Sequence, residues 1–333
     1  MKLTIVKLSA MGDIVHAMVT LQYIKQKYPT LQIDWIVEQS FIQVLEGNPH
    51  IDNILSVNLK SIKKDKMKIF SQIKLIREYS KRDYDLVIDA QGLIKSAITA
   101  KLLSGKKLAG FSKKSIREGI ASYLYNQKVE IAYSANTIDR NAKVLSEPLD
   151  FEITPNMIMD KEAFLFYDEN QFTITEYLSK EKKNIIFIIG STWESRNYPK
   201  DKFARIANKL QANCLVASGS EAEYEKALWI ECHSKHARAL PKINLNSLKA
   251  IIAKSDLLIG NDTGPTHMAW GLNIPSITIF GPTPVNRVYQ TPINRVIKSN
   301  SKVDHYNLNK NDFSICDIQS DDIIKIAREL LNG

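Results

Sequence analysis

Short apolar runs alternate with stretches of helical spacing along the first half of the chain. The β-branched run 3–8 leads into the polar turn 9–13, and apolar residues then recur at helical spacing until Pro29. Further strands are predicted at 33–37, 54–57, 86–90 and 108–110, and helices near 67–80 and 93–103. Strands that alternate with helices are typical of a parallel sheet covered on both faces.

The alternation restarts after an interruption at 147–156, which contains Pro148 and Pro155 and which we interpret as an interdomain linker. Strands are then predicted at 185–190, 214–218, 257–260 and 276–280, and helices at 200–210, 221–236, 246–254, 265–271 and 321–331. A single hydrophobic core rarely grows past about 250–300 residues, so the 333 residues predict two domains. We expect an α/β fold of two Rossmann-like, doubly wound domains, 1–155 and 156–320, facing a central cleft. We expect a C-terminal helix in 321–333 to follow. One option is that this helix packs back on the N-terminal domain.

The charge is uneven along the chain. The formal net charge is +9, and the first 160 residues hold 23 basic and 17 acidic side chains against 22 and 19 in the remainder. A basic first half indicates an anionic partner, such as nucleic acid, a membrane surface or an acidic small molecule. The longest uncharged stretch, 263–286, contains four prolines and is no membrane helix, so any membrane contact is expected to be peripheral. The three cysteines lack CxxC spacing and predict the reduced thiols of a cytoplasmic protein.

The turn Ser9-Ala10-Met11-Gly12-Asp13 stands where the first predicted strand gives way to a helix. Ligands of doubly wound sheets bind at the carboxyl ends of the strands. The helix dipole keeps a carboxylate in the first turn ionised, and such a group facing a cleft is suited to act as a general base. Asp also favours this position as a plain helix cap, so the spacing leaves both interpretations of Asp13 open.

Two strand ends in the second half carry clustered polar groups. The segment 259–267 opens a helix whose N-terminus, with Gly264 allowing close approach, is suited to bind phosphate. The segment 190–199 combines hydroxyl groups with Arg196, whose guanidinium suits a diphosphate. The alternative for 259–267 is a tight turn with a packed histidine. The alternative for 190–199 is a surface loop with an exposed arginine.

A fourth strand end, 89–96, lies in the half of the chain that holds two basic clusters. Their members are Lys60, Lys63, Lys64, Lys66 and Lys68, and then Lys101, Lys106, Lys107, Lys113, Lys114 and Arg117. Charged runs usually form a solvated surface, but their concentration in one half favours an anionic ligand there. Aromatic residues are not interleaved with the lysines as stacking on bases would require, which disfavours nucleic acid.

Several common motifs are missing. The chain contains neither GxGxxG nor GxxxxGK[ST], so the dinucleotide and P-loop fingerprints are absent. Asp83-Tyr84-Asp85 has the DxD spacing of metal-binding sugar transferases, but it precedes a strand and so lies at the wrong edge of the sheet. No metal site is predicted, and the charge of a leaving group would be neutralised by helix termini and cationic side chains.

Together these motifs resemble glycosyltransferase family 9, the heptosyltransferases of lipopolysaccharide core synthesis, over essentially the whole chain. The resemblance is carried by 7–16, by 88–96, and by 262–267 together with 280–283. The family implies a GT-B fold and inverting, metal-independent transfer with no cofactor beyond the donor substrate, ADP-L-glycero-β-D-manno-heptose. It implies a Kdo-lipid A acceptor on the cytoplasmic face of the inner membrane, no nucleic-acid partner, and an enzyme held peripherally on that anionic surface. The Ala-Gln-Gly and Lys-Ser of 88–96 favour transfer of the first heptose over the second.

The resemblance also implies roles for single residues. Asp13 would be the catalytic base; Ser191, Thr192 and Arg196, which replaces the lysine of many relatives, would hold the diphosphate. Glu223 would reach the ribose, and Ile243 would line the adenine pocket. Asp262, Thr263, Gly264 and His267 would grip phosphate and heptose. The acceptor would meet Lys60, Lys63, Lys64, Lys95, Arg117 and Arg140, although Asn136 stands where the family carries a histidine four residues before Arg140.

Two other functions remain open at this point. A related transferase could add the second heptose or use another nucleotide-linked sugar. A non-catalytic nucleotide-binding protein docked on the membrane would bind ADP without consuming the donor, although such a protein has no need of a base at Asp13.

Overall fold

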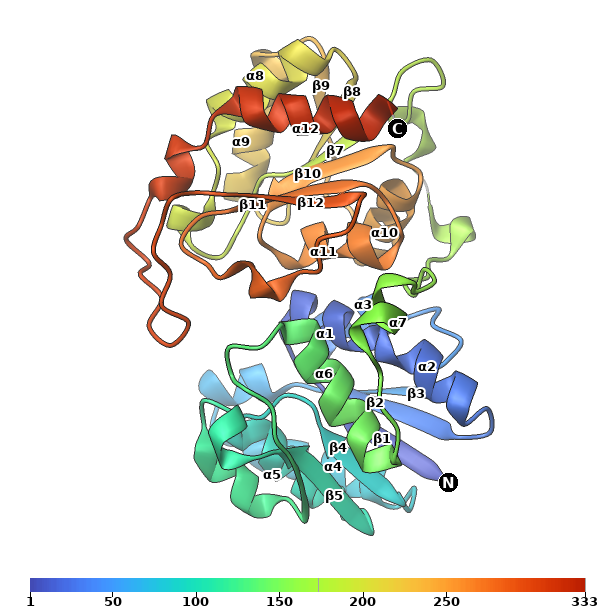
Figure 1. Ribbon diagram of the computed structural model, residues 1–333. Helices are drawn as coiled ribbons and strands as arrows, with labels where there is room; N and C mark the ends of the chain where they lie inside the picture. The colour runs from blue at the N-terminus through green and yellow to red at the C-terminus, as the bar shows by residue number, and fades with distance from the viewer. Residues whose placement is uncertain (173, 333) are drawn as a thin grey trace. The chain divides into compact units, whose positions relative to one another are not determined.

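The computed structural model describes residues 1–172 and 174–332 and divides into two compact units, Met1–Phe166 and Tyr167–Gly333 (Figure 1). The division falls eleven residues after the predicted boundary at 155. The reason is that the segment after Thr154 packs on the first unit. Pro155 begins the short helix α7 (Pro155–Met159), and the Asn48 side chain donates to the Phe164 carbonyl at 3.2 Å.

The first unit contains a sheet of six parallel strands in the order β3-β2-β1-β4-β5-β6. The strand order reverses between β1 and β4, which is where doubly wound sheets bind their ligands. The strands are β1 (Lys2–Val6), β2 (Gln32–Glu38), β3 (Asn53–Val57), β4 (Leu86–Asp89), β5 (Lys107–Phe111) and β6 (Gln127–Val129).

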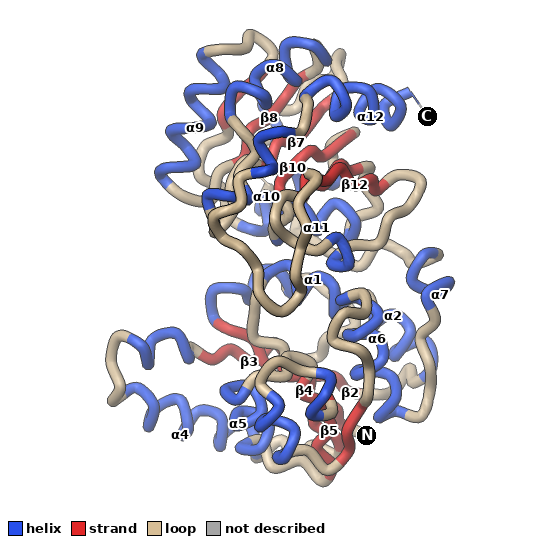
Figure 2. Tube along the Cα trace, turned by 60° about the vertical axis from the view of Figure 1, so that its left-hand side comes forward, coloured by secondary structure: helices blue, strands red, loops and turns tan. Residues whose placement is uncertain are grey.

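Helices cover this sheet in two layers. Helices α1 (Met11–Met18), α2 (Thr20–Lys27), α3 (Ile42–Leu45) and α6 (Thr137–Ser146) pack together on one face. Helices α4 (Lys68–Ser80) and α5 (Ile94–Leu102) lie side by side on the other face (Figure 2). Short 3-10 helices join these elements: η1 (Gln39–Phe41), η2 (Leu59–Lys63), η3 (Lys113–Ser115) and η4 (Gly119–Leu124).

The second unit repeats the architecture, with parallel strands in the order β12-β11-β10-β7-β8-β9 and a reversal between β10 and β7. The strands are β7 (Asn184–Ile188), β8 (Asn213–Ala217), β9 (Ala237–Ala239), β10 (Leu257–Asn261), β11 (Ser276–Phe280) and β12 (Asn294–Lys298). The longer helices are α8 (Lys200–Leu210), α9 (Glu221–Cys232), α10 (Leu245–Ala253), α11 (Gly264–Gly271) and α12 (Ser320–Asn332). The predicted α/β fold of two Rossmann-like domains is therefore confirmed.

The C-terminal helix α12 belongs to the second unit. Ile323, Ile324 and Ala327 are buried in the core of the second unit, and Asp321 pairs with Arg205 of α8 at 2.8 Å. The alternation of apolar and charged residues in α12 gives it one apolar face, which this core covers. Among the described residues, no helix has the length and apolar content that crossing a membrane requires.

Candidate active site

Gln91 joins the turns that follow β1 and β4 in the first unit. Its side-chain carbonyl accepts hydrogen bonds from the backbone N–H groups of Leu8 at 3.0 Å and Ser9 at 3.1 Å. The motif 88–96 therefore supports the motif 7–16 directly. One amide side chain fixes the path of the backbone that leads to Asp13.

Asp13 lies in the first turn of α1 and is partly exposed. Its Oδ2 accepts a hydrogen bond from the N–H of Ala10 at 3.2 Å. Within 1–172 and 174–332, its other oxygen has no hydrogen-bond partner, and the carboxylate forms no ion pair. Asp13 thus acts as a cap through one oxygen and keeps the other available, so the two interpretations of this residue are compatible.

A buried cation, Lys7, lies behind this turn. Its ammonium group donates to the carbonyl of Ala90 at 2.7 Å and to the Asn141 side chain at 2.9 Å. Burial lowers the pKa of Lys7, while the negative charges of Asp13 and Asp89 act to raise it. Lys7 could not be predicted as a buried cation, because the sequence around a lysine at the end of a strand does not indicate whether it will be buried.

Asp89 is buried and holds the β4 turn together. It accepts hydrogen bonds from the N–H of Gln91 at 2.8 Å, the Ser96 hydroxyl at 2.9 Å and the Tyr125 hydroxyl at 2.7 Å. Burial raises the pKa of Asp89, and these hydrogen bonds oppose that rise. Gly92 follows with φ +72°, a conformation that favours glycine. Asp89 is therefore a structural residue that positions Gln91.

The six predicted acceptor residues all lie in the first unit. Lys60 donates to the Ser40 hydroxyl at 3.3 Å and lies 4.5 Å from the centre of the Phe41 ring. Four of the others are exposed: Lys63 ends η2, Lys64 follows it, Lys95 lies on α5 and Arg117 follows η3.

Arg140 is held by the chain itself. Its guanidinium donates to the carbonyls of Ala132 at 2.9 Å and Ser115 at 2.7 Å, and it lies 5.0 Å from the Phe111 ring centre. Asn136, which replaces the family's histidine, caps α6 by accepting from the N–H of Ile138 at 2.8 Å. The departure at position 136 is thus compatible with a well-formed start of this helix.

Glu38, at the carboxyl end of β2, was missed by the sequence analysis. It is buried, and burial raises the pKa of its carboxyl group against the charges of Lys95 and Lys60. Its Oε1 is buried without a hydrogen-bond partner in the part of the chain that the structure describes. The charges of two predicted acceptor residues, Lys95 and Lys60, thus act on Glu38, whose backbone N–H donates to the Leu8 carbonyl at 3.2 Å. The signal in the sequence that could have identified Glu38 is an acidic residue directly after the apolar run 33–37.

In the second unit, Asp262 is the centre of a buried charged cluster. Arg196 donates to its Oδ2 at 2.8 Å and also to its backbone carbonyl, and His267 Nε2 lies 3.2 Å from Oδ1. The Thr283 hydroxyl donates to Oδ2 at 2.9 Å, and Arg287 Nη1 lies 4.0 Å away. Residues from the predicted motifs at 190–199, 262–267 and 280–283 therefore meet here.

The electrostatics fix Asp262 as an anion and Arg196 as a cation. Burial alone would raise the pKa of Asp262, but the hydrogen bond from His267 and the charges of Arg196 and Arg287 outweigh it, and the pKa lies below its usual range. Burial lowers the pKa of Arg196 against the charge of Asp262. Because an arginine starts from a pKa above about 12, its guanidinium remains protonated.

The loop after β7 is tied to β10 but leaves polar atoms without partners. The Asn261 side chain accepts from the N–H of Tyr198 at 3.0 Å and donates to the Ile189 carbonyl at 2.8 Å. Within the described residues, four buried atoms of the loop have no hydrogen-bond partner: Ser191 Oγ, Ser195 Oγ, Arg196 Nε and Asn197 Oδ1. Buried polar groups are rarely left unpaired, so this loop carries hydrogen-bonding groups that the described residues do not satisfy.

Glu223, in the first turn of α9, reaches back across the end of β7. Its Oε2 accepts from the N–H of Gly219 at 2.7 Å, and a Cβ at Gly190 would collide with its carboxylate. A larger residue at position 190 would therefore displace the Glu223 carboxylate from its place beside Gly219. Thr192 is exposed on the loop after β7, and the partly buried Ile243 lies between β9 and α10.

Comparison with known proteins identifies the family. A family model described as glycosyltransferase family 9 (heptosyltransferase) matches residues 72–314. Lipopolysaccharide heptosyltransferase 1 of Campylobacter coli is 36% identical to this chain, over 99% of each chain. The chain belongs to glycosyltransferase family 9.

Members of glycosyltransferase family 9 from other organisms are more distant. Lipopolysaccharide heptosyltransferase 1 of Pseudomonas aeruginosa is 27% identical, over 85% of this chain and 79% of its own length. The solved structure of E. coli heptosyltransferase WaaC with ADP-2-deoxy-2-fluoro heptose matches with a TM-score of 0.80 at 23% identity, covering 100% of both chains. That of E. coli ADP-heptose lps heptosyltransferase II has a TM-score of 0.76 at 19% identity, covering 100% of this chain and 99% of that chain. These structures share the fold predicted as GT-B, and this family 9 chain is a glycosyltransferase.

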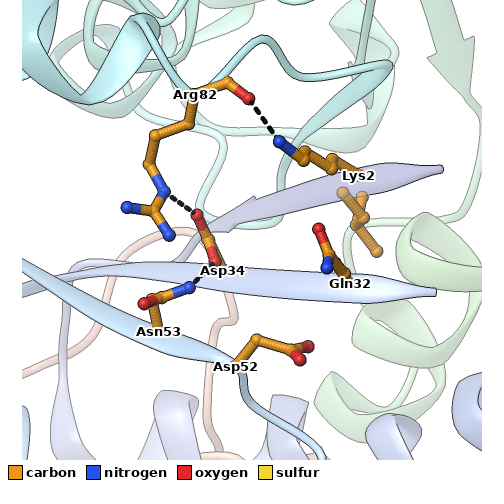
Figure 3. Close-up of a pocket in the computed structure, with 7 residues that line it drawn as sticks. Lys2, Gln32, Asp34, Asp52, Asn53 and Arg82 are labelled. Carbon is orange, nitrogen blue, oxygen red and sulfur yellow. Dashed lines mark hydrogen bonds and ion pairs between the residues drawn. The ribbon is translucent and has the colours of Figure 1, made fainter. Parts of the chain in front are cut away.

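A pocket of about 490 Å³ lies at the opposite edge of the first sheet, where β1, β2 and β3 begin (Figure 3). There Asp34 accepts from Arg82 Nε at 2.7 Å, from the Tyr84 hydroxyl at 2.7 Å and from the Asn53 side chain at 2.8 Å. The polar side chains at this pocket are thus largely paired with one another. Asp83 and Asp85, which have the DxD spacing, flank Tyr84 just before β4 begins, as the sequence predicts. They therefore lie at the amino ends of the strands, whereas the predicted site residues follow the carboxyl ends.

Proposed function

We propose that this chain is an inverting, metal-independent heptosyltransferase of lipopolysaccharide inner-core synthesis. It would transfer L-glycero-D-manno-heptose from ADP-heptose to the Kdo of Kdo-lipid A, at the cytoplasmic face of the inner membrane. The names of the relatives from C. coli and P. aeruginosa support heptose transfer in lipopolysaccharide synthesis. The ADP-2-deoxy-2-fluoro heptose in the E. coli WaaC structure supports an ADP-linked heptose donor. The observation that carries the proposal is a contrast between two carboxylates. Asp13 is partly exposed, whereas Asp262 is a buried anion that holds cationic side chains around it.

Asp13 would act as the general base through the oxygen that has no partner among the described residues. It takes the proton of an acceptor hydroxyl while that oxygen forms a bond to the anomeric carbon of heptose. The bond from the anomeric carbon to the β-phosphate oxygen breaks, and its electron pair leaves with ADP. Attack from the face opposite the leaving group inverts the configuration at that carbon.

The second unit would hold the donor and stabilise the departing ADP. Arg196, together with the hydroxyls of Ser191 and Thr192, would hold the diphosphate, and the N-terminus of α11 at Thr263 and Gly264 would face the phosphate charge. Asp262 would act by orienting Arg196 and His267 toward phosphate and heptose. Glu223 and Ile243 would hold the ribose and the adenine.

The first unit would hold the acceptor. Lys60, Lys63, Lys64, Lys95 and Arg117 would meet the carboxylates and phosphates of the acceptor, since charge-assisted hydrogen bonds favour such groups. Arg140, whose donors contact backbone carbonyls, would support this surface from within.

The deciding experiment is a product-mass assay with ADP-heptose and Kdo-lipid A. A mass gain of one heptose on the Kdo-lipid A supports the proposal, and Asp13→Asn should abolish the gain while ADP still binds. Product formed only on an acceptor that already carries heptose would identify a transferase of the second heptose. ADP binding without donor consumption in wild-type enzyme would indicate a non-catalytic nucleotide-binding protein.

A further inference from the structure

A group of large apolar side chains is exposed on the helical layer formed by α4 and α5. Seven of the thirteen large apolar side chains that are exposed among the described residues lie between 67 and 123, so they are concentrated rather than scattered. They are Met67, Ile69, Phe70, Ile94, Ile98, Ile120 and Tyr123. We call this set the apolar patch.

The spacing within each element places the patch residues in pairs on one side. Phe70 follows Met67 by three residues at the start of α4, with 67% and 71% of the two side chains exposed. Ile94 and Ile98 are one turn apart on α5, and this spacing puts them on one helix face. Each element thus exposes an apolar pair toward solvent instead of toward the sheet.

Contacts within the first unit join these elements into one surface. α4 packs on η2 and α5, and α5 packs on η4, which contacts η3. The carboxylate of Glu118 accepts a hydrogen bond from the N–H of Ile94 at 2.7 Å, which ties the start of α5 to the segment carrying Ile120 and Tyr123. Figure 2 shows α4 and α5 side by side, with the segment before α4 extending beyond the sheet.

Lysines lie next to residues of the apolar patch and outnumber the acidic residues in the segment 60–70. Lys66 and Lys68 flank Met67, and Lys113 lies 5.7 Å from the centre of the Tyr123 ring. Asp65, the acidic residue of the 60–70 cluster, accepts from the N–H of Met67 at 3.0 Å. The surface therefore combines exposed apolar groups with excess positive charge.

We propose that the apolar patch and its lysines dock the first unit on the surface of an anionic lipid bilayer. Apolar side chains inserted at the headgroup boundary and lysines paired with lipid phosphates are the two signals that stable peripheral binding requires. A second copy of this chain fits less well, because pairing two such surfaces would bring like charges together. The inference rests on the proposed function, whose acceptor is a lipid: Lys64 and Lys95 of the predicted acceptor set border the patch.

The test is co-sedimentation of full-length protein with vesicles of phosphatidylethanolamine and phosphatidylglycerol that contain no sugar-bearing lipid. Met67→Ser with Phe70→Ser should weaken binding by about tenfold or more. Lys66→Ala and Lys68→Ala should weaken it by roughly fivefold each, and added salt should weaken wild-type binding. Phosphatidylcholine vesicles should bind far less protein.

Matched controls lie in the second unit. Phe313→Ser removes an aromatic side chain that is 51% exposed, and Lys180→Ala with Lys182→Ala removes two exposed lysines. These variants should bind vesicles like wild type. The proposal is overturned if the patch variants bind vesicles as wild type does, or if the control variants lose as much binding as the patch variants. It is also overturned if the patch variants bind vesicles normally and instead lose a dimer that wild type shows in sedimentation velocity.

An activity readout separates this inference from the proposed function. The patch variants should retain wild-type turnover on a water-soluble, deacylated Kdo acceptor and lose turnover on acceptor embedded in vesicles. If wild-type protein transfers no heptose but the vesicle data hold, the proposed function fails and the docking surface stands. If transfer occurs and patch variants bind vesicles normally, the docking surface fails alone.

Discussion

Each unit carries a carboxylate after one of the two strands between which its sheet order reverses, and the surroundings of the two carboxylates differ. Asp13 follows β1 and Asp262 follows β10, each next to the strand pair where the sheet order reverses. Asp13 is partly exposed, with one oxygen lacking a partner among the described residues. Asp262 is 2% exposed and is held by Arg196, His267 and Thr283.

The surroundings of each carboxylate determine which chemistry it can perform. A carboxylate that must accept a proton needs a free lone pair and access to the substrate. A carboxylate whose pKa is pushed below its usual range by cations is a poor base but a good anchor, because it holds those cations in position. The same fold thus supplies a candidate base in one unit and a framework for anion binding in the other.

The largest expected effect is on turnover. Asp13→Asn keeps a side-chain oxygen for the Ala10 cap but removes the base, so turnover should fall about 10²–10⁴-fold. The melting temperature and ADP affinity should not change. Steady-state kinetics with calorimetry check this, and turnover within a few fold of wild type would remove Asp13 from the mechanism.

Asp262→Ala should act mainly on stability. It leaves the Arg196 guanidinium buried without its anion, and breaking a buried pair in this way costs about 3–5 kcal/mol. Urea unfolding measures the loss, and isothermal titration should show that ADP affinity falls with it. A stable variant with intact ADP binding would contradict the role of Asp262 as an anchor.

Gln91→Ala should have an intermediate effect. The N–H groups of Leu8 and Ser9 lose their acceptor, at a cost of about 1–3 kcal/mol, and the turn before Asp13 loosens. We expect a fall in kcat with little change in ADP affinity. Gln91→Glu retains the accepting oxygen and should restore most of the activity, which a generally destabilised fold would not allow.

The smallest effect concerns pH. Burial raises the pKa of Glu38 in the folded protein, so as pH rises the unfolded state loses this proton first. Glu38 therefore lowers stability as pH increases from the unfolded pKa, near 4.3, through the raised folded value. Glu38→Gln should melt higher than wild type at pH 7 and like wild type near pH 4. Glu181→Gln controls for the loss of one charge, and a lower melting temperature for Glu38→Gln at pH 7 would contradict the prediction.

The central strands could be predicted from the sequence because buried parallel strands form continuous apolar runs. The edge strands β6, β9 and β12 escaped prediction: they are short or carry charged residues such as Lys128, Arg238 and Arg295, as edges exposed to solvent allow. The helix α6 was also missed, because its start depends on a cap by Asn136 and its buried face includes Asn141.

The candidate site was predictable where its residues are local to a strand end. The motifs containing Asp13, Arg196 and Asp262 could be selected because βα turns collect polar groups at one edge of a sheet. Which side chains meet could not be predicted. Gln91 on Leu8 and Glu38 beside Lys95 depend on the pairing of β1 with β4 and β2, which is a property of the three-dimensional fold.

The contact between Gly190 and Glu223 has a consequence for how this chain can vary. The two positions are 33 residues apart, yet a methyl group at 190 and a carboxylate at 223 compete for the same volume. Gly190→Ala alone should displace Glu223 from Gly219, whereas Glu223→Ala removes the three atoms nearest to the new methyl group. The double variant should therefore be more stable than the two single effects add up to. Because the carboxylate of Glu223 is the end of a flexible side chain, residue 190 can be enlarged at the cost of this contact, and a shorter residue 223 removes that cost.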